Sequence, residues 1–192
     1  MHEALFNYIG QYTQATLTPQ EQELIRNAFV PKRLRKRQYL LQSGDICRYM
    51  AFIVKGAMRQ YSVDEKGAEH IVQLAIENWW VGDRESFLML TPSAFNIDAW
   101  EDTDLLLVEK AHLFQLYEQV PTLTKMARQM DDRHSMANQR RINAAISFSA
   151  EKRYTDFTLQ HPELVQRFPQ HLIASYLGIT KETLSRIRKH SL

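Results

Sequence analysis

The sequence has a single cysteine, Cys47, among its 192 residues. One thiol excludes an intrachain disulfide, a zinc site built from several cysteines, and an iron–sulfur cluster held by the cysteines of one chain. We therefore interpret Cys47 as a small packed side chain in a strand rather than as a redox centre.

The sequence also lacks an apolar run long enough to span a bilayer. Its first twelve residues have neither the basic start nor the uninterrupted apolar core of a signal peptide. A composition of 44% hydrophobic and 24% charged residues is typical of a globular chain with one sizeable domain or two small ones. We therefore expect a cytoplasmic protein that does not bind membranes.

Patterns typical of catalysis are missing as well. A metal-dependent enzyme of the cupin type needs two closely spaced histidines and a carboxylate, but the strand-rich region contains only His70. A packed or solvated histidine is the commoner outcome at such a position. No serine lies in the glycine pattern of a nucleophile elbow. We expect neither catalytic activity nor a metal site.

The net charge of +2 conceals an uneven distribution of charge. Residues 64–109 contain eleven acidic and two basic residues, whereas residues 167–192 contain five basic residues and only Glu182 as an acid. A local basic surface near the C-terminus favours a polyanionic partner. A second basic cluster, Lys32 to Arg37, alternates around Leu34 as in an exposed strand or loop. We interpret that cluster as a solvated surface.

Helical periodicity frames a strand-rich middle. Residues 3–12 show helical spacing, and Thr18 with Glu21 forms a capping box that opens a helix before Pro31. Short apolar runs at the spacing of a β-sandwich or barrel occupy residues 38–41, 49–54, 57–63, 70–76, 94–100 and 104–108. Residues 64–67 read as a hairpin turn with glycine. Residues 81–87 read as a short loop with a helical turn.

The second half returns to helical patterns at residues 110–118, 121–148 and 150–160. The long segment from Pro121 to Phe148 has no internal glycine or proline. Its apolar seam, with steps of three and four, resembles a heptad repeat and favours a helix that pairs with a second copy. Packing of that helix on its own domain explains the periodicity equally well. The seam consists of Leu123, Met126, Met130, His134, Ala137, Arg141, Ala144 and Phe148.

The most informative stretch, Phe168 to Arg188, predicts two short helices joined by a tight turn. Pro169 suits a first helical position. Gly178 can adopt the left-handed conformation that ends a helix, and Thr180 is a suitable N-cap for the next one. This pattern predicts a helix-turn-helix whose second helix reads DNA. An ordinary helical hairpin with a solvated charged face is the alternative.

Several side chains of the second helix should face outward and contact DNA. We expect Arg186 to bind guanine in a bidentate manner, Glu182 to accept from cytosine, and Lys181 to reach a base or an adjacent phosphate. The DNA backbone should be held by Ser185, Arg188 and Lys189. The predicted DNA-binding set is completed by Gln170 and Thr180.

A glycine-punctuated β-roll, a long helix and a C-terminal helix-turn-helix, in this order, resemble the Crp/Fnr family of bacterial transcriptional regulators. The resemblance covers nearly the whole chain, and its most specific run is residues 173–187. In the family, the positions that match Lys181, Glu182 and Arg186 contact bases. The other residues that carry the resemblance are 40–45, 52–56, 64–67 and 100–105.

The resemblance implies an α+β fold with three parts. Residues 1–109 would form an effector-sensing β jelly-roll of the cyclic-nucleotide-binding type with N-terminal helices, residues 110–148 a linker and dimerisation helix, and residues 149–192 the DNA-binding unit. Residues 161–168 are too short for a β-hairpin and the sequence stops at Leu192. We therefore expect the wing strands of many family members to be missing, and DNA binding to be weaker as a result.

The effector cassette departs from the family pattern. Members that bind cyclic AMP use a glutamate from a Phe-Gly-Glu-Leu run and an arginine from a Pro-Arg-(Ala/Ser)-Ala run. Here Asp83 stands at the glutamate position and Ser93 at the arginine position. Loss of the guanidinium removes the main fixed charge for the phosphate, so we expect no useful affinity for cyclic AMP, and no cofactor is certain. The candidate lining for another effector is Gly82, Asp83, Arg84, Glu85, Ser86, Ser93, Asn138 and Gln139.

We therefore predict a homodimeric, sequence-specific regulator that binds a palindromic site on double-stranded DNA. Its two reading helices would lie about one DNA turn (~34 Å) apart. RNA polymerase is a further candidate partner. The alternative is a small-molecule sensor or adaptor whose C-terminal helices bind a protein. An apolar stripe on the outer helix would favour that alternative, but the outward residues are charged.

Overall fold

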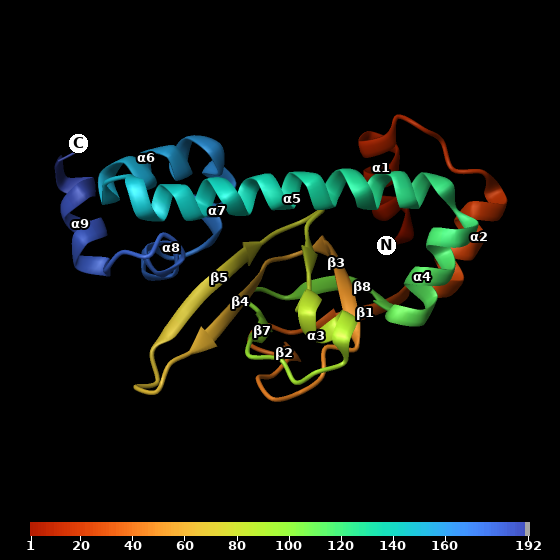
Figure 1. The fold of residues 1–192 in the computed structure, drawn as a ribbon, viewed down its shortest axis with the longest axis horizontal. Coiled ribbons are helices and arrows are strands. Elements are labelled where there is room, and N and C mark those ends of the chain that lie inside the picture. Colours follow the sequence, from red (N-terminus) through yellow and green to blue (C-terminus); the bar gives the residue numbers. More distant parts are fainter. Residues whose placement is uncertain (191–192) are drawn as a thin grey trace.

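The computed structural model describes residues 1–190 and shows an α+β chain with a β-roll, a long helix and a helical C-terminal unit (Figure 1). The long helix, α5 (Pro121–Ser147), runs the length of the molecule. The roll lies along one side of α5, and the C-terminal helices lie at one of its ends. This confirms the predicted order of parts. The last residues of the predicted third part, Ser191 and Leu192, lie outside the described residues.

The roll consists of two four-stranded antiparallel sheets. Its strands are β1 (Val30–Leu34), β2 (Tyr39–Leu41), β3 (Tyr49–Lys55), β4 (Met58–Val63), β5 (Glu69–Ala75), β6 (Trp80–Val81), β7 (Asn96–Ala99) and β8 (Thr103–Glu109). The sheet orders are β1-β8-β3-β6 and β2-β7-β4-β5. The predicted hairpin joins β4 and β5, and Gly67 has the positive φ of 79° that its turn requires. Because β5 is an edge strand, the backbone groups along its outer side need partners from elsewhere.

Helices surround the roll and form the C-terminal unit. They are α1 (His2–Thr13), α2 (Pro19–Ala28), α3 (Arg84–Met89), α4 (Lys110–Gln119), α6 (Ala150–Gln160), α7 (Pro162–Arg167), α8 (Gln170–Tyr176) and α9 (Lys181–His190). The predicted capping box at α2 is present, with Thr18 and Glu21 each binding the backbone of the other. None of the helices in residues 1–190 is both long enough and apolar enough to cross a membrane.

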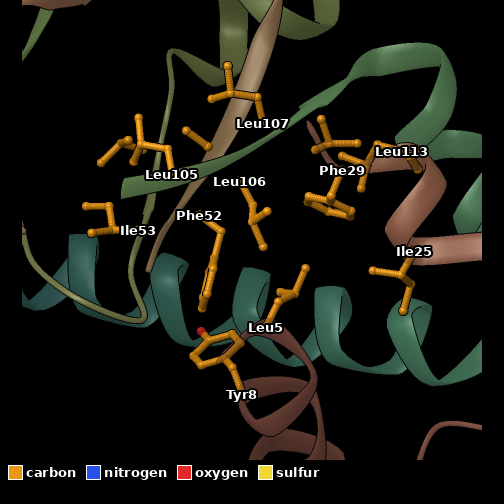
Figure 2. Packing of buried hydrophobic residues seen from close by; sticks show 14 of the residues in the cluster. Leu5, Tyr8, Ile25, Phe29, Phe52, Ile53, Leu105, Leu106, Leu107 and Leu113 are labelled. Carbon is orange, nitrogen blue, oxygen red and sulfur yellow. The ribbon is translucent and has the colours of Figure 1, made fainter. Parts of the chain in front are cut away.

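The main hydrophobic core contains buried side chains from α1, the roll and the start of α5, between Leu5 and Met126. Phe52 and Leu106 face each other across β3 and β8 and are fully buried. In Figure 2 they point toward Leu5 and Tyr8 of α1. Leu123, at the start of α5, belongs to the same cluster. Burial of each such leucine or phenylalanine side chain contributes about 1.5–3 kcal/mol to the hydrophobic stabilisation, so α5 is anchored firmly to the roll.

Some predicted element boundaries differ from the structure. Residues 161–168 contain the short helix α7, because Pro162 occupies a first helical position after α6 ends. Pro169 precedes α8 as its N-cap and is not its first helical residue. The strand β6 was not predicted. Residues 32–34 of the basic cluster lie in β1, which is exposed except at Leu34, in agreement with the predicted exposed strand or loop. Cys47 is buried, but it lies two residues before β3.

The predicted pairing seam of α5 contacts its own chain at the start of the helix and at Arg141. Leu123 and Met126 are buried in the main core, and Met130 packs against it. Further along, Arg141 donates from Nη1 to the Val72 carbonyl at 2.7 Å and lies over the Tyr176 ring. The first part of this seam, up to Met130, therefore packs on the domain itself. From residue 131 to residue 137 every residue of α5 is exposed, including His134 and Ala137 of the seam.

A second hydrophobic cluster joins the roll to the C-terminal helices. It contains Tyr61 and Ile71 from the outer side of the β4–β5 pair together with Phe168, Leu172 and Ile173 from the α7–α8 region. Figure 1 shows α8 beside the β5 strand. The C-terminal unit is thus packed onto the roll as well as being linked to it through α5.

Candidate nucleic-acid interface and effector site

The helices α8 and α9 form the predicted helix-turn-helix. At the turn, Gly178 has φ 65°, its N–H binds the Ser175 carbonyl, and the Ile179 N–H binds the Ala174 carbonyl at 2.9 Å. These two bonds are the Schellman arrangement that ends a helix at a left-handed glycine. The close crossing of α8 and α9 is fixed by Ala174 and Leu184, which are 1% and 0% exposed.

The start of α9 is capped as the sequence predicts. The Thr183 N–H donates to the Thr180 hydroxyl at 3.1 Å, and the Leu184 N–H binds the Thr180 carbonyl. One threonine hydroxyl also hydrogen-bonds to the other at 3.0 Å. Arg186 Nη2 lies 3.4 Å from the Thr183 hydroxyl, so the guanidinium is held beside the first turn of the helix.

The outer face of α9 is polar and exposed. Within residues 1–190, Arg186 makes no ion pair, and Lys181 approaches only its neighbour Glu182 at 3.8 Å. A groove of about 380 Å³ between α6 and α9 is lined by Glu151, Thr183, Arg186 and Ile187. The exposed predicted contacts are Gln170, Thr180, Lys181, Glu182, Ser185, Arg186, Arg188 and Lys189. The structure thus brings this set to one end of the chain, on and beside α9.

Two arginines of the C-terminal unit face inward, and the sequence did not indicate this. Arg167, which was counted in the basic surface, instead binds Glu77 and Glu101 of the roll. Arg153 Nη1 donates to the Leu177 carbonyl at 2.9 Å, at the end of α8. Of the five basic residues in 167–192, Arg167 is therefore neutralised within the chain, and the exposed positive charge comes from Lys181, Arg186, Arg188 and Lys189.

Ser175 is another residue that sequence reasoning missed. Its hydroxyl accepts from the Ile71 N–H at 3.0 Å and donates to the Glu69 carbonyl at 3.2 Å, both on the outer edge of β5. Serine within a short amphipathic helix carries no signal of such a contact, because the partner lies about a hundred residues away.

The effector residues around α3 are hydrogen-bonded to one another. Asp83 caps α3 through Oδ1, which accepts from the Glu85 and Ser86 N–H groups. Its Oδ2 accepts from the Ser93 hydroxyl at 2.7 Å. The Ser86 hydroxyl donates to the Thr91 carbonyl and accepts from the Cys47 N–H. The carboxylate of Asp83 and the hydroxyls of Ser86 and Ser93 are thus all hydrogen-bonded within the protein.

Two further members of the set, Gly82 and Arg84, are also engaged. A side chain at Gly82 would meet Met50 Sδ at 2.5 Å, so the backbone packs closely there. Arg84 forms a bidentate pair with Asp131 of α5, and its hydrogen bond to that carboxylate raises the pKa of Arg84 while lowering the pKa of Asp131.

The two α5 members of the predicted lining, Asn138 and Gln139, lie about two helical turns beyond Asp131. In the described part of the chain, they form no hydrogen bond with the group around Asp83. Residues 1–190 also contain no group of three or more His, Cys, Asp or Glu side chains placed to hold a metal ion.

The sequence and the fold of this chain are similar to those of known proteins. A family model described as a cyclic nucleotide-binding domain matches residues 31–120. The transcriptional activator protein Anr of Pseudomonas aeruginosa is 26% identical over 171 residues, which covers 80% of this chain and 67% of that protein. The structure of FixK2 from Bradyrhizobium japonicum is similar, with a TM-score of 0.72, 18% identity and coverage of 84% of this chain and 83% of the other.

The Catabolite Activator Protein of Thermus thermophilus is also similar, with a TM-score of 0.58, 20% identity and coverage of 91% and 83% of the two chains. The domain match, the sequence relative and the shared fold agree with one another and with the helix-turn-helix geometry. Residues 31–120 match the cyclic nucleotide-binding domain family, and the chain as a whole is similar to transcriptional regulators of the Crp/Fnr family.

Proposed function

We propose that this chain binds a palindromic DNA site as a homodimer and inserts α9 of each copy into the major groove. The observation that carries the proposal is the exposed polar face of α9 on a well-formed helix-turn-helix. Arg186 would contact guanine and Glu182 cytosine, because these side chains offer matching donors and acceptors. Lys189 and its neighbours would bind phosphates, which adds affinity without sequence preference.

The dimer would form through the exposed face of α5. Ile142 and Ile146 are 59% and 79% exposed, which is unusual for isoleucines placed in one row of a helix. With steps of three and four, they continue a row through Asp132, Ser135 and Gln139, the spacing of a helix pair. We name this row the outer seam. It lies away from Arg141, which faces the roll, so a second copy could reach it without disturbing the domain.

The effector site would not bind cyclic AMP. The Ser93 hydroxyl supplies no positive charge for a phosphate, and it is already committed to Asp83. Arg84, the nearest guanidinium in the sequence, is paired with Asp131. DNA binding would therefore not depend on cyclic AMP.

Selection from a random DNA library by the purified protein at physiological salt tests this function. Recovery of a palindrome is the expected result, and light scattering should show two copies per site. Recovery of no specific sequence, with or without cyclic AMP, would contradict the proposal and favour a C-terminal unit that binds protein.

A further inference from the structure

The roll holds the C-terminal unit at three places. Arg167 of α7 donates from Nη1 to Glu77 Oε2 at 3.0 Å and from Nε to Glu101 Oε1 at 2.8 Å. Ser175 of α8 occupies the N–H of Ile71 and the carbonyl of Glu69. The third place is the second hydrophobic cluster, which fills the space between them. We name the polar part of this contact, Arg167 with Glu77 and Glu101 and Ser175 with β5, the latch.

The geometry of the latch restricts rotation as well as separation. Arg167 binds two carboxylates that come from different loops, one before β6 and one after β7. Glu77 is itself fixed, because it accepts the Gly56 N–H at 2.7 Å. A planar guanidinium held by two carboxylates has a defined orientation, unlike a lysine point charge. The Ser175 contact lies on another helix and another strand, so the unit is tied at separate points.

A further contact fixes α5 at the same edge. Val72 is the extra residue where the β4–β5 register shifts, between the pairs Gln60–Gln73 and Tyr61–Ile71. Its carbonyl accepts from Arg141 of α5. The α5 and α8 helices are therefore both held by one short stretch of β5, through Val72 for α5 and through Glu69 and Ile71 for α8. The direction of α9 relative to α5 follows, since α8 and α9 are locked by their turn.

The latch leaves the DNA-reading face open. Arg186, Glu182 and Lys189 are exposed, and none has a hydrogen bond to the roll within residues 1–190. The contact therefore orients α9 without covering it. A role in blocking DNA would require the roll to lie over these side chains.

We infer that Arg167 and Ser175 are positioning residues that set the separation of the two reading helices, and hence the half-site spacing that the dimer selects. This inference rests on the proposed function, since the spacing has meaning only for a two-fold dimer paired through α5. The spacing of half-sites is a geometric property of such a dimer. A loosened latch would let each unit pivot and would accept a wider range of spacings.

The test uses a series of palindromes built from the half-site of the selected sequence. The distance between the two half-sites varies across the series in steps of one base pair, over a range of several base pairs. Binding of the full chain is measured for each. The wild-type protein should bind the palindrome with the preferred spacing about tenfold or more tightly than palindromes whose spacing differs by two base pairs. Ser175→Ala and Arg167→Gln should reduce that preference to about threefold or less, with weaker binding at the best spacing.

Arg167→Gln leaves two carboxylates unpaired and could unfold the chain, so a second variant removes the charges together. Arg167→Met with Glu77→Gln and Glu101→Gln leaves no uncompensated partly buried charge. Its thermal melting checks that it is folded. Arg26→Gln is the matched control, because Arg26 pairs with Glu3 at 2.6 Å between α1 and α2, far from the C-terminal unit. It should retain the wild-type spacing preference.

A merely structural role would lower affinity by the same factor at every spacing, and that result would overturn the inference. An unchanged preference in the neutral triple variant would overturn it as well. If the wild-type chain binds none of the palindromes, the proposed function itself fails, and the inference falls with it.

Discussion

Ser93 donates its hydroxyl proton to Asp83 Oδ2 over 2.7 Å, and both side chains are almost completely buried. The other carboxylate oxygen of Asp83 caps α3. Asp83 thus connects the start of α3 to Ser93, in the segment before β7. The residues that were predicted to bind an effector are thus held together by the protein's own hydrogen bonds.

Removal of this carboxylate should destabilise the protein. Asp83→Ala deletes the cap of α3 and leaves the buried Ser93 hydroxyl without its acceptor, and we expect a loss of about 1–3 kcal/mol. Urea unfolding followed by circular dichroism measures it. Asp156→Ala removes an exposed carboxylate paired with Lys152, and should change the stability by less than about 0.5 kcal/mol. Equal effects of the two substitutions would show that the Asp83 bonds contribute nothing.

The same bonds predict that cyclic AMP has no effect on the protein. A ligand that binds the folded state raises the melting temperature. At a concentration one hundred times its Kd, it adds about 2.7 kcal/mol to the free energy of unfolding. Without a guanidinium at position 93, we expect no shift with cyclic AMP at millimolar concentration. A titration calorimetry signal with a low-micromolar Kd would refute this prediction.

If two copies pair through the outer seam, a single charged substitution in the seam should dissociate the dimer. Ile142→Asp or Ile146→Asp would place two carboxylates opposite each other in a parallel helix pair, where like charges and lost apolar contact both oppose association. Light scattering at micromolar concentration should then show monomers. Leu159→Asp on α6 is the matched control, because Leu159 is 77% exposed and lies outside the seam. A monomeric control, or dimeric seam variants, would exclude the seam as the interface.

Features that depend on neighbouring residues were predictable from the sequence. The capping box at Thr18, the left-handed Gly178 and the N-cap at Thr180 follow from local chemistry, and the structure confirms each. The order of roll, long helix and helix-turn-helix followed from periodicity in the same way. The identity of the exposed α9 face was also recoverable, since a helix with one buried stripe leaves the other side outward.

Features that depend on distant segments were not predictable. Ser175 binds β5 and Arg167 binds two loops of the roll, across about 66 to 106 residues of sequence. The periodicity of α5 left open whether its seam packs on a second copy or on its own domain, and the structure shows that Leu123 and Met126 are buried within the chain. Periodicity states that a face is buried but does not state which surface covers it. Asp83 and Ser93 were singled out as ligand residues, but not as partners of each other.

The two kinds of DNA contact on α9 should differ in their consequences. Arg186→Ala should cost about 1–3 kcal/mol and relax the preference at one position of each half-site, because a bidentate base contact is lost. Lys189→Ala should weaken all sequences alike and reduce the salt slope by about one, because a phosphate contact is lost. Binding to a set of single-base variants at several salt concentrations separates the two. Arg48→Ala, on an exposed loop of the roll, should leave both properties unchanged.

The latch should give the stability an acid-dependent component. Burial acts to raise the pKa of Glu77, but the hydrogen bonds from Arg167 and the Gly56 N–H outweigh it and hold that pKa below its ordinary value of 4.5. A carboxylate with a lowered folded pKa contributes stability that is fully present above the ordinary value. That stability is lost as the pH falls through the lowered pKa.

Unfolding free energies of the wild-type chain and Glu77→Gln, measured from pH 7 to pH 2, test this. The wild-type chain should be the more stable near neutral pH, and the difference should shrink only below about pH 4.5. Arg167→Met with Glu101→Gln should flatten the dependence, because without the guanidinium only the backbone hydrogen bonds from Gly56 and Glu77 lower the pKa of Glu77. A difference that stays constant over the whole range would mean that the Glu77 charge does not stabilise the contact, and the latch would then depend on Ser175 and the second hydrophobic cluster alone.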